Sequence, residues 1–172
     1  KALGSFRAHW QTEIGSFPEH PTVIIANEFF DSLPIRQFKR ERNQWMEVMI
    51  TIKNPSDKKC NKLSFELSDV GMNKEFLSET DNIPDGTIIE FSEQTQNIIN
   101  YISDHIQQNS GAALIIDYGK EGNVGNTFQA VRQHQYSNPL KFPGLTDLTS
   151  YVDFNAIRNS AEKSGLIASK LT

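Results

Sequence analysis

The sequence predicts an α/β fold in which an antiparallel β excursion is inserted between two parallel strands. Three observations carry this prediction. Residues 22–28 and 112–117 are apolar runs typical of buried parallel strands, an amphipathic helical pattern precedes the second run, and residues 35–66 alternate between apolar and polar side chains. A strand, a helix and a parallel strand in this order predict a right-handed crossover.

Composition limits the classes of protein to which the chain can belong. Its 172 residues are 37% hydrophobic and 22% charged, which indicates one globular domain. The net charge of −4 argues against nucleic acid as a partner, and no apolar run reaches the roughly 20 residues of a membrane span. Cys60 is the only cysteine, so no internal disulfide forms and a reducing compartment is expected.

The two ends of the chain resemble cuts in a longer protein. The sequence opens on Lys rather than Met, has no signal peptide, and stops soon after a new apolar stretch begins. Within the first segment, Leu3, Phe6 and Trp10 are spaced as one side of a short helix.

The alternating region predicts antiparallel strands. Residues 35–53 are expected to form a β-hairpin with a loop at residues 41–44, and residues 54–61 an exposed turn. Another strand follows, with Leu63, Phe65 and Leu67 on one side, and TIIEFS is a further strand.

Capping residues delimit two helices. Ser92 is a predicted N-cap, and apolar residues recur at helical spacing from Ile98 to Ile106 before Gly111 ends the helix. The segment up to Ser150 lacks a clear period. Asp153 is a predicted second N-cap, Gly165 ends that helix, and LIA at residues 166–168 predicts a third strand.

Both apolar runs end in polar side chains. Asn27, Glu28 and Asp31 follow the first run, and Asp117 and Tyr118 follow the second. Ligands of open α/β sheets bind beyond the carboxyl ends of the strands, so these side chains are expected to face a shared cleft. Two interpretations stay open for residues 27–31. They form a ligand site from which two phenylalanines exclude water, or one carboxylate caps the next turn and the phenylalanines belong to the core.

Other kinds of site find little support in the sequence. The four histidines have no paired ligand spacing and Cys60 has no partner, so no metal site is predicted. A Gly-x-Ser-x-Gly elbow is absent, which leaves a hydrolase using a rim carboxylate as the weakest interpretation.

Three longer motifs follow one another along the chain: IIANEFFDSLPIRQF, GAALIIDYG and NTFQAVRQHQYSNPLKFPGLTDLTSYVDF. In this order they closely resemble the MidA-like family of class I S-adenosylmethionine-dependent methyltransferases. That family includes a mitochondrial complex I assembly factor that methylates an arginine of a complex I subunit. The resemblance runs from about HWQTEIG to SGLI.

The resemblance implies a partial class I methyltransferase sheet, Rossmann-like, with S-adenosyl-L-methionine as cofactor and no metal. It places residues 27–31 beside the transferring methyl group, where carboxylates can hold a guanidinium in a fork and accept its proton. The implied catalytic residues are Glu28, Asp31 and Asn27, and the implied cofactor-binding residues are Asn27, Phe29 and Phe30. The implied substrate-binding residues are Asp117, Tyr118, Gln129, Asp147, Thr149 and Asp153.

The same resemblance implies one partial methyltransferase domain over residues 1–172. Its parts are a strand and site motif (22–34), an inserted β region (35–91), a helix and strand (92–119), and an acceptor-side loop and helix (120–172). The family's glycine-rich cofactor loop is expected before Lys1. Asn126 and Tyr151 stand where the family usually has Asp and His.

The implied partner is a protein substrate, with neither nucleic acid nor membrane. A sheet edge without its neighbour also predicts that the isolated chain is marginally stable or self-associates. The expected compartment is the mitochondrial matrix for a eukaryotic source and the cytoplasm for a bacterial one. The alternative function is a non-catalytic assembly factor or protein-binding module that uses the same cleft.

Overall fold

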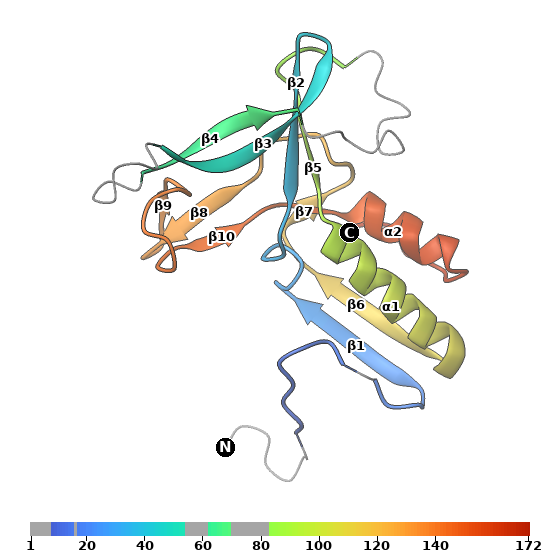
Figure 1. Cartoon of the computed structure of the whole chain (residues 1–172). Helices are drawn as coiled ribbons and strands as arrows, with labels where there is room; N and C mark the ends of the chain where they lie inside the picture. The colour runs from blue at the N-terminus through green and yellow to red at the C-terminus, as the bar shows by residue number, and fades with distance from the viewer. Residues whose placement is uncertain (1–7, 16, 54–61, 70–82) are drawn as a thin grey trace.

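Two parallel strands and two helices form the lower layer of the computed structural model (Figure 1). The structure describes residues 8–15, 17–53, 62–69 and 83–172. Strand β1 (Thr22–Asn27) pairs in parallel with β6 (Gly111–Ile116), and helices α1 (Glu93–Asn109) and α2 (Phe154–Lys163) pack against each other beside them. The predicted parallel pair with an inserted β region is therefore confirmed.

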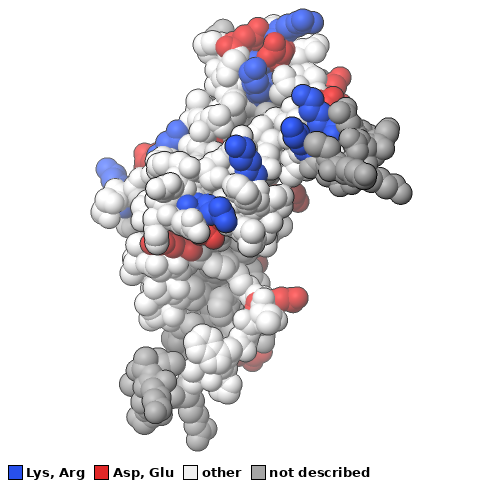
Figure 2. Space-filling view, turned by 90° about the vertical axis from the view of Figure 1, so that its left-hand side faces the viewer, with Lys and Arg blue, Asp and Glu red and all other residues white. Residues whose placement is uncertain are grey.

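The β1–β6 sheet is covered on one face. Ile24, Ala26 and Ile115 pack against the helical core. The other face, called the bare face below, carries exposed apolar side chains: Val23 (74% exposed), Ile25 (66%), Leu114 (54%) and Ile116 (48%). The lower half of the surface in Figure 2 carries few charged side chains. The prediction that both faces are buried is wrong, because these four side chains are each between 48% and 74% exposed.

Helix α1 begins and ends close to the predicted residues. The Ser92 hydroxyl accepts a 3.2 Å hydrogen bond from the backbone N–H of Thr95, which confirms the N-cap. The helix ends at Asn109 with Ser110 as its C-cap, at φ 65°, directly before the predicted stop at Gly111. Gly111 already belongs to β6, where a Cβ would lie 2.1 Å from the Thr22 carbonyl oxygen. Glycine is needed there for close approach of the two strands.

Helix α2 completes the hydrophobic core. Asp153 accepts hydrogen bonds from the N–H groups of Asn155 (3.0 Å) and Ala156 (3.1 Å), which confirms this N-cap. The buried core consists of Phe30, Ile99, Ile102, Val152 and Ile157. The predicted third strand at residues 166–168 is wrong, since that segment has no strand structure. In the described residues it finds no neighbouring strand with which to pair.

A four-stranded antiparallel sheet rises above this layer, in the order β4-β3-β2-β5 (Figure 1). Its strands are β2 (Arg36–Glu41), β3 (Gln44–Lys53), β4 (Lys62–Ser68) and β5 (Ile88–Phe91). The hairpin turns at Arg42 (φ 49°) and Asn43 (φ 62°), as a two-residue primed turn requires. This confirms the predicted hairpin and the two strands after it.

Short strands organise the segment between residues 119 and 153, most of which lacks a clear period in the sequence. They are β7 (Gly119–Lys120), β8 (Gln129–Arg132), β9 (Gln135–Ser137), β10 (Asp147–Thr149) and β11 (Val152–Asp153). The order β10-β8-β9 forms a small antiparallel sheet, and β11 pairs in parallel with β7. Strands of two to four residues are too short to leave a readable period in the sequence.

The first described residues are extended rather than helical. Trp10 is 89% exposed in a segment without helix, so the predicted short helix is absent from residues 8–15. Leu3, Phe6, the predicted turn at residues 54–61 and Cys60 lie outside the described residues. Neither α1 nor α2 is long and apolar enough to cross a membrane.

Candidate functional site

The carboxyl ends of β1 and β6 meet at one edge of the sheet. Asn27 lies opposite Ile116 in the parallel register. The N–H of Glu28 donates a 2.9 Å hydrogen bond to the carbonyl oxygen of Ile116, which extends the pairing beyond the last ladder position. The predicted convergence of the two polar strand ends is confirmed, in the place where α/β sheets bind ligands.

The Asp117 carboxylate binds the backbone that follows β1. Its Oδ2 accepts hydrogen bonds from the N–H groups of Phe29 (3.1 Å), Phe30 (2.8 Å) and Asp31 (3.3 Å). Its Oδ1 accepts a 2.8 Å hydrogen bond from the N–H of Tyr118. Successive N–H groups around one carboxylate form an anion nest, so Asp117 fixes the conformation of residues 29–31.

Glu28 is the residue at which the chain turns out of β1. Its φ of 46° lies in the left-handed region, which a glutamate adopts only when the surrounding structure imposes it. The hydrogen bond to Ile116 on one side and the Asp117 nest on the other impose it here. Asn27 and Glu28 consequently present exposed side chains at the sheet edge.

Asp31 is buried next to two other carboxylates. Only 8% of the residue is exposed. Burial raises the pKa of Asp31, and the charges of Asp117 and Glu28 raise it further. Its carbonyl oxygen accepts a 2.9 Å hydrogen bond from the N–H of Ser150, which joins residues 27–31 to the segment that leads into α2.

The two phenylalanines of this stretch differ in exposure. Phe30 is 2% exposed and packs in the core with Ile99 and Val152. Phe29 is half-buried and meets Phe30 edge-on, with ring centroids 5.2 Å apart and an interplanar angle of 87°. Phe29 is therefore the aromatic that a molecule at the sheet edge can reach, and Phe30 supports it from behind.

The structure places the other sequence-predicted residues on β8 and β10, just after β6 and at the start of α2. Gln129 and Thr149 are register partners of β8 and β10, and the Gln129 Nε2 donates a 3.2 Å hydrogen bond to the Thr149 hydroxyl. Tyr118 is 62% exposed and Asp147 is also exposed. Asp153 caps α2 and also accepts a 2.9 Å hydrogen bond from the N–H of Gly122. Asp153 therefore stabilises the start of α2 independently of any part in binding.

Glu90 is a central residue that sequence reasoning missed. Its buried carboxylate accepts hydrogen bonds from the Gln37 amide (2.8 Å), the Thr127 N–H (2.9 Å) and hydroxyl, and the Phe128 N–H (3.1 Å). The Thr127 hydroxyl in turn accepts a 2.8 Å hydrogen bond from the N–H of Tyr151. The sequence signal that could have identified it is a single carboxylate inside the apolar run of β5, because a buried carboxylate needs hydrogen-bond partners.

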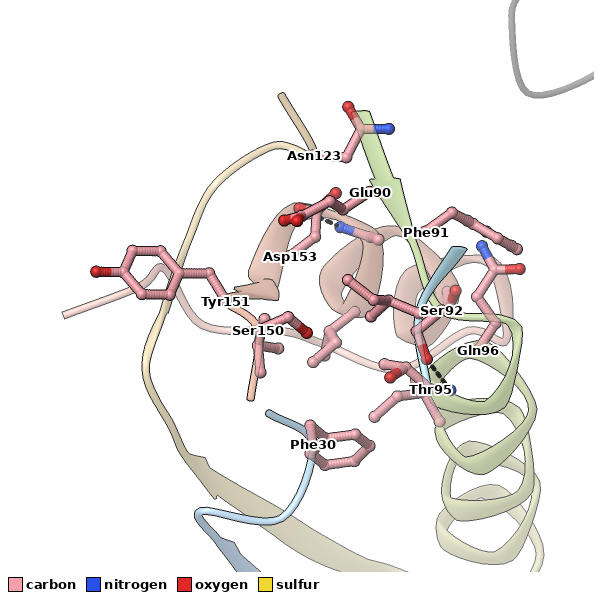
Figure 3. A pocket seen from close by; sticks show the side chains of 16 residues that line it. Phe30, Glu90, Phe91, Ser92, Thr95, Gln96, Asn123, Ser150, Tyr151 and Asp153 are labelled. Carbon is pink, nitrogen blue, oxygen red and sulfur yellow. Dashed lines mark hydrogen bonds between the residues drawn. The ribbon is translucent and has the colours of Figure 1, made fainter. Parts of the chain in front are cut away.

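A cavity of about 170 Å³ lies between the first turns of α1 and α2 and the segment 150–153 (Figure 3). We call it the interhelix cavity. Its walls are partly apolar, with Phe30 and Ile157 among them, and partly polar, with Ser150, Glu90 and Asp153. Phe30 thus belongs both to the 27–31 stretch and to this cavity.

Among the described residues, no group of three or more His, Cys, Asp or Glu side chains is arranged to hold a metal ion. The acidic groups at the sheet edge instead bind backbone N–H groups or face solvent. Their arrangement suits recognition of a hydrogen-bonding or cationic molecule at the carboxyl end of β1.

Comparison with known proteins identifies the family. A model of the family described as "Putative S-adenosyl-L-methionine-dependent methyltransferase" matches residues 3–172. The chain belongs to this family. The match covers almost the whole chain, and it confirms the resemblance to the MidA-like methyltransferases.

Curated relatives agree with this assignment. The chain is 33% identical over 164 residues to "Protein arginine methyltransferase NDUFAF7, mitochondrial" of Danio rerio, covering 89% of this chain and 35% of the relative. The human protein of the same name is 32% identical over 160 residues, covering 93% and 35%. The chain thus spans about a third of the length of these methyltransferases.

Solved structures share the fold. A Burkholderia thailandensis crystal structure superposes with a TM-score of 0.72 at 21% identity, covering 87% of this chain and 41% of that one. A second one, bound to S-adenosyl-homocysteine, gives 0.70 at 21% identity, covering 88% and 40%. These matches confirm the predicted α/β fold as a partial, Rossmann-like methyltransferase fold of this family.

Proposed function

We propose that this chain is part of an S-adenosylmethionine-dependent methyltransferase that methylates an arginine of a protein, of the respiratory complex I subunit type. The family match and the names of the relatives support this activity. The observation that carries the proposal is the Asp117 nest, which binds the backbone of residues 29–31 next to the exposed Asn27 and Glu28 at the carboxyl end of β1.

The residues at this edge fit a cofactor with a polar end and a cationic sulfur. The Asn27 amide is exposed beside the half-buried Phe29 ring, so these two side chains are the proposed cofactor contacts. Phe30 is 2% exposed, and its part is to support the ring of Phe29. When bound, S-adenosylmethionine supplies an electrophilic methyl group. An aromatic neighbour favours a cationic sulfur through its ring face.

Glu28 and Asp31 are the proposed catalytic carboxylates. The exposed Glu28 side chain would orient the guanidinium of the acceptor by a charge-assisted hydrogen bond. Asp31 has a raised pKa, which makes it a better proton acceptor than an ordinary aspartate. As the guanidinium nitrogen is alkylated it must lose a proton, and Asp31 is the proposed base.

The acceptor side is proposed to include Tyr118, Gln129, Asp147 and Thr149, with Asp117 and Asp153 bracing it. Residues 1–172 form one partial methyltransferase domain in this proposal. The proposed compartment is the mitochondrial matrix if the source is eukaryotic, as the names of the relatives support, or the cytoplasm if it is bacterial.

A non-catalytic assembly factor or protein-binding module is the second candidate. The observation that favours it is the exposure of the Asn27 and Glu28 side chains, which can bind polar groups of a partner protein as they stand. In this case the cleft at the end of β1 would hold a partner protein without transferring a group to it.

Calorimetric titration of S-adenosylmethionine separates the two candidates. The methyltransferase proposal predicts saturable, one-to-one binding by the full-length protein, which Asn27→Ala weakens. Binding by the full-length protein but not by the 172-residue chain would place further cofactor contacts outside this segment. An absence of binding by both would favour the binding module and contradict the enzyme.

A further inference from the structure

We propose that the interhelix cavity binds a guanidinium group, the head of an arginine side chain of the protein substrate. This inference rests on the proposed function, because it names where a further arginine of the protein substrate, distinct from the acceptor held by Glu28, is recognised. It concerns a site on the helical side of the β1–β6 sheet, whereas Asn27 lies on the bare-face side, in register with Ile116.

Ser150 is the first observation that indicates a ligand. The residue is 4% exposed and lines the cavity. Its backbone N–H donates to Asp31, but its hydroxyl has no hydrogen-bond partner in the part of the chain that the structure describes. Figure 3 shows this hydroxyl oxygen directed into the cavity. A hydroxyl that faces the cavity can accept a hydrogen bond, and a guanidinium N–H would supply one.

The charges of the cavity select a cation. Glu90 and Asp153 both line it, and none of its lining residues is Lys, Arg or His. Each carboxylate has acceptor capacity left. Glu90 Oε2 accepts only from the Thr127 hydroxyl, and Asp153 Oδ2 accepts nothing among the described residues. A guanidinium has five N–H donors and no acceptor, which matches this set.

The helix N-termini beside the cavity do not reverse this preference. The N-terminal end of a helix attracts anions through its free N–H groups. At α1 the N–H of Thr95 is bonded to the Ser92 hydroxyl, and at α2 the N–H groups of Asn155 and Ala156 are bonded to Asp153. These donors already have partners, so the two full negative charges dominate.

Size and shape favour a planar group. The cavity of about 170 Å³ is comparable to the roughly 150 Å³ engineered cavity that holds a benzene molecule. In the view of Figure 3 the Phe30 ring lies at one end, and Glu90 and Asp153 lie at the other. An aromatic ring and carboxylates around one space suit a guanidinium better than an ammonium, because the flat cation stacks and bonds in its plane.

The cavity is coupled to the proposed catalytic residues by direct contacts. Ser150 is hydrogen-bonded to Asp31 through the backbone, and Phe30 precedes Asp31 in the chain. An arginine bound here is held against the same segment that carries the catalytic carboxylates. The cavity would thereby orient the substrate protein on the enzyme.

Methyl-labelled NMR of the full-length protein tests binding directly. Ile35, Ile99 and Ile157 line the cavity, whereas Ile50 and Ile52 of β3 are exposed elsewhere and serve as controls. Titration with methylguanidinium should shift the three cavity signals saturably and leave the controls unchanged. Acetate should leave all five unchanged, and methylammonium should shift the cavity signals less. No saturable shift, or an equal shift with acetate, would overturn the proposal.

Two isosteric variants test the role of the hydroxyl groups. Ser150→Ala should weaken methylguanidinium binding roughly three- to tenfold, because one hydrogen bond to a charged group is lost. Thr95→Val removes a second hydroxyl at the cavity wall and should also weaken binding. Ser103→Ala is the matched control, since Ser103 is 1% exposed on α1 and does not line the cavity. Equal affinities for all three variants would contradict the inference.

Parallel assays separate this inference from the proposed function. In Ser150→Ala the KM for the protein substrate should rise while S-adenosylmethionine affinity stays as in the wild type. If the protein methylates its substrate and Ser150→Ala leaves KM unchanged, the cavity assignment fails and the enzyme stands. If no methylation occurs but methylguanidinium still binds in the cavity, the methyltransferase proposal fails and the guanidinium site stands.

Discussion

The Asp117 carboxylate accepts a 2.8 Å hydrogen bond from the backbone N–H of Phe30, across the carboxyl ends of two parallel strands. The same oxygen binds the N–H groups on either side of Phe30, so one side chain sets the path of the chain after β1. Asn27 and Glu28 are exposed beside this contact, and Phe30 is buried. The geometry of the proposed catalytic edge therefore depends on a residue 86 positions away from Asp31.

Removal of the Asp117 carboxylate should cost stability. Asp117→Ala leaves the N–H groups of Phe29, Phe30 and Asp31 without their acceptor, and we expect a loss of about 2–4 kcal/mol in the free energy of unfolding. Urea denaturation of the full-length protein measures it. Asp147→Ala is the control, since Asp147 is exposed and should change stability by less than about 0.5 kcal/mol. Equal effects of the two variants would contradict a nest at Asp117.

The raised pKa of Asp31 predicts a pH dependence of stability. The folded state holds the proton of Asp31 more tightly than the unfolded state does. The contribution of Asp31 to the free energy of unfolding is therefore greatest at low pH, and it is lost as pH rises through the raised pKa. Asp31→Asn has no proton to lose. Its melting temperature relative to wild type should therefore rise between acid and neutral pH and then stay constant. A constant difference across this range would show that Asp31 does not titrate as proposed.

Glu90→Ala should lower the free energy of unfolding about as much as Asp117→Ala does. Glu90→Ala removes the acceptor for the amide of Gln37 and for the N–H groups of Thr127 and Phe128, and we expect a loss of about 2–4 kcal/mol. Thr127→Ser keeps the hydroxyl that bonds Glu90 and Tyr151, so its cost should stay below about 1 kcal/mol. Chemical denaturation of both variants provides the comparison. A mild Glu90→Ala phenotype would mean that solvent replaces these bonds.

The bare face should make the isolated 172-residue chain self-associate. Large contiguous apolar surfaces are rarely left open in monomers, and Ile25 and Leu114 are the register partners at the centre of this one. The double variant Ile25→Thr, Leu114→Thr should lower the sedimentation coefficient observed at high concentration. Tyr136→Thr, at an exposed tyrosine of β9, should not. A wild-type chain that stays monomeric with a concentration-independent melt would refute this prediction.

Much of the fold could be predicted because local chemistry specifies it. Ser92 and Asp153 are capping residues followed by helical apolar spacing, and both begin helices. The apolar runs of β1 and β6 pair in parallel, and a two-residue primed turn at Arg42 and Asn43 joins β2 to β3. The caps and the turn are specified by neighbours in the sequence, and each apolar run indicates a strand by itself.

The parts that could not be predicted depend on contacts distant in the sequence. An apolar run such as β1 has the same sequence pattern whether one or both of its faces are covered. The sequence therefore does not indicate that the bare face is exposed. The strands β8 and β10 are short and exist through their pairing with each other. Glu90 and Ser150 are isolated polar residues whose importance appears only when the 120–153 segment folds over β5.

Methylation of the substrate by a Glu28→Gln variant tests the central claim most directly. The full-length wild-type protein and the variant are each incubated with S-adenosylmethionine and extracts of cells that lack the gene, and arginine methylation is measured by mass spectrometry. Because the side chain of Glu28 is exposed, the variant should fold with an unchanged melting temperature. We predict methylation by the wild type and a loss of at least about 100-fold in the variant. Near-normal methylation by Glu28→Gln would contradict the assignment of the catalytic edge.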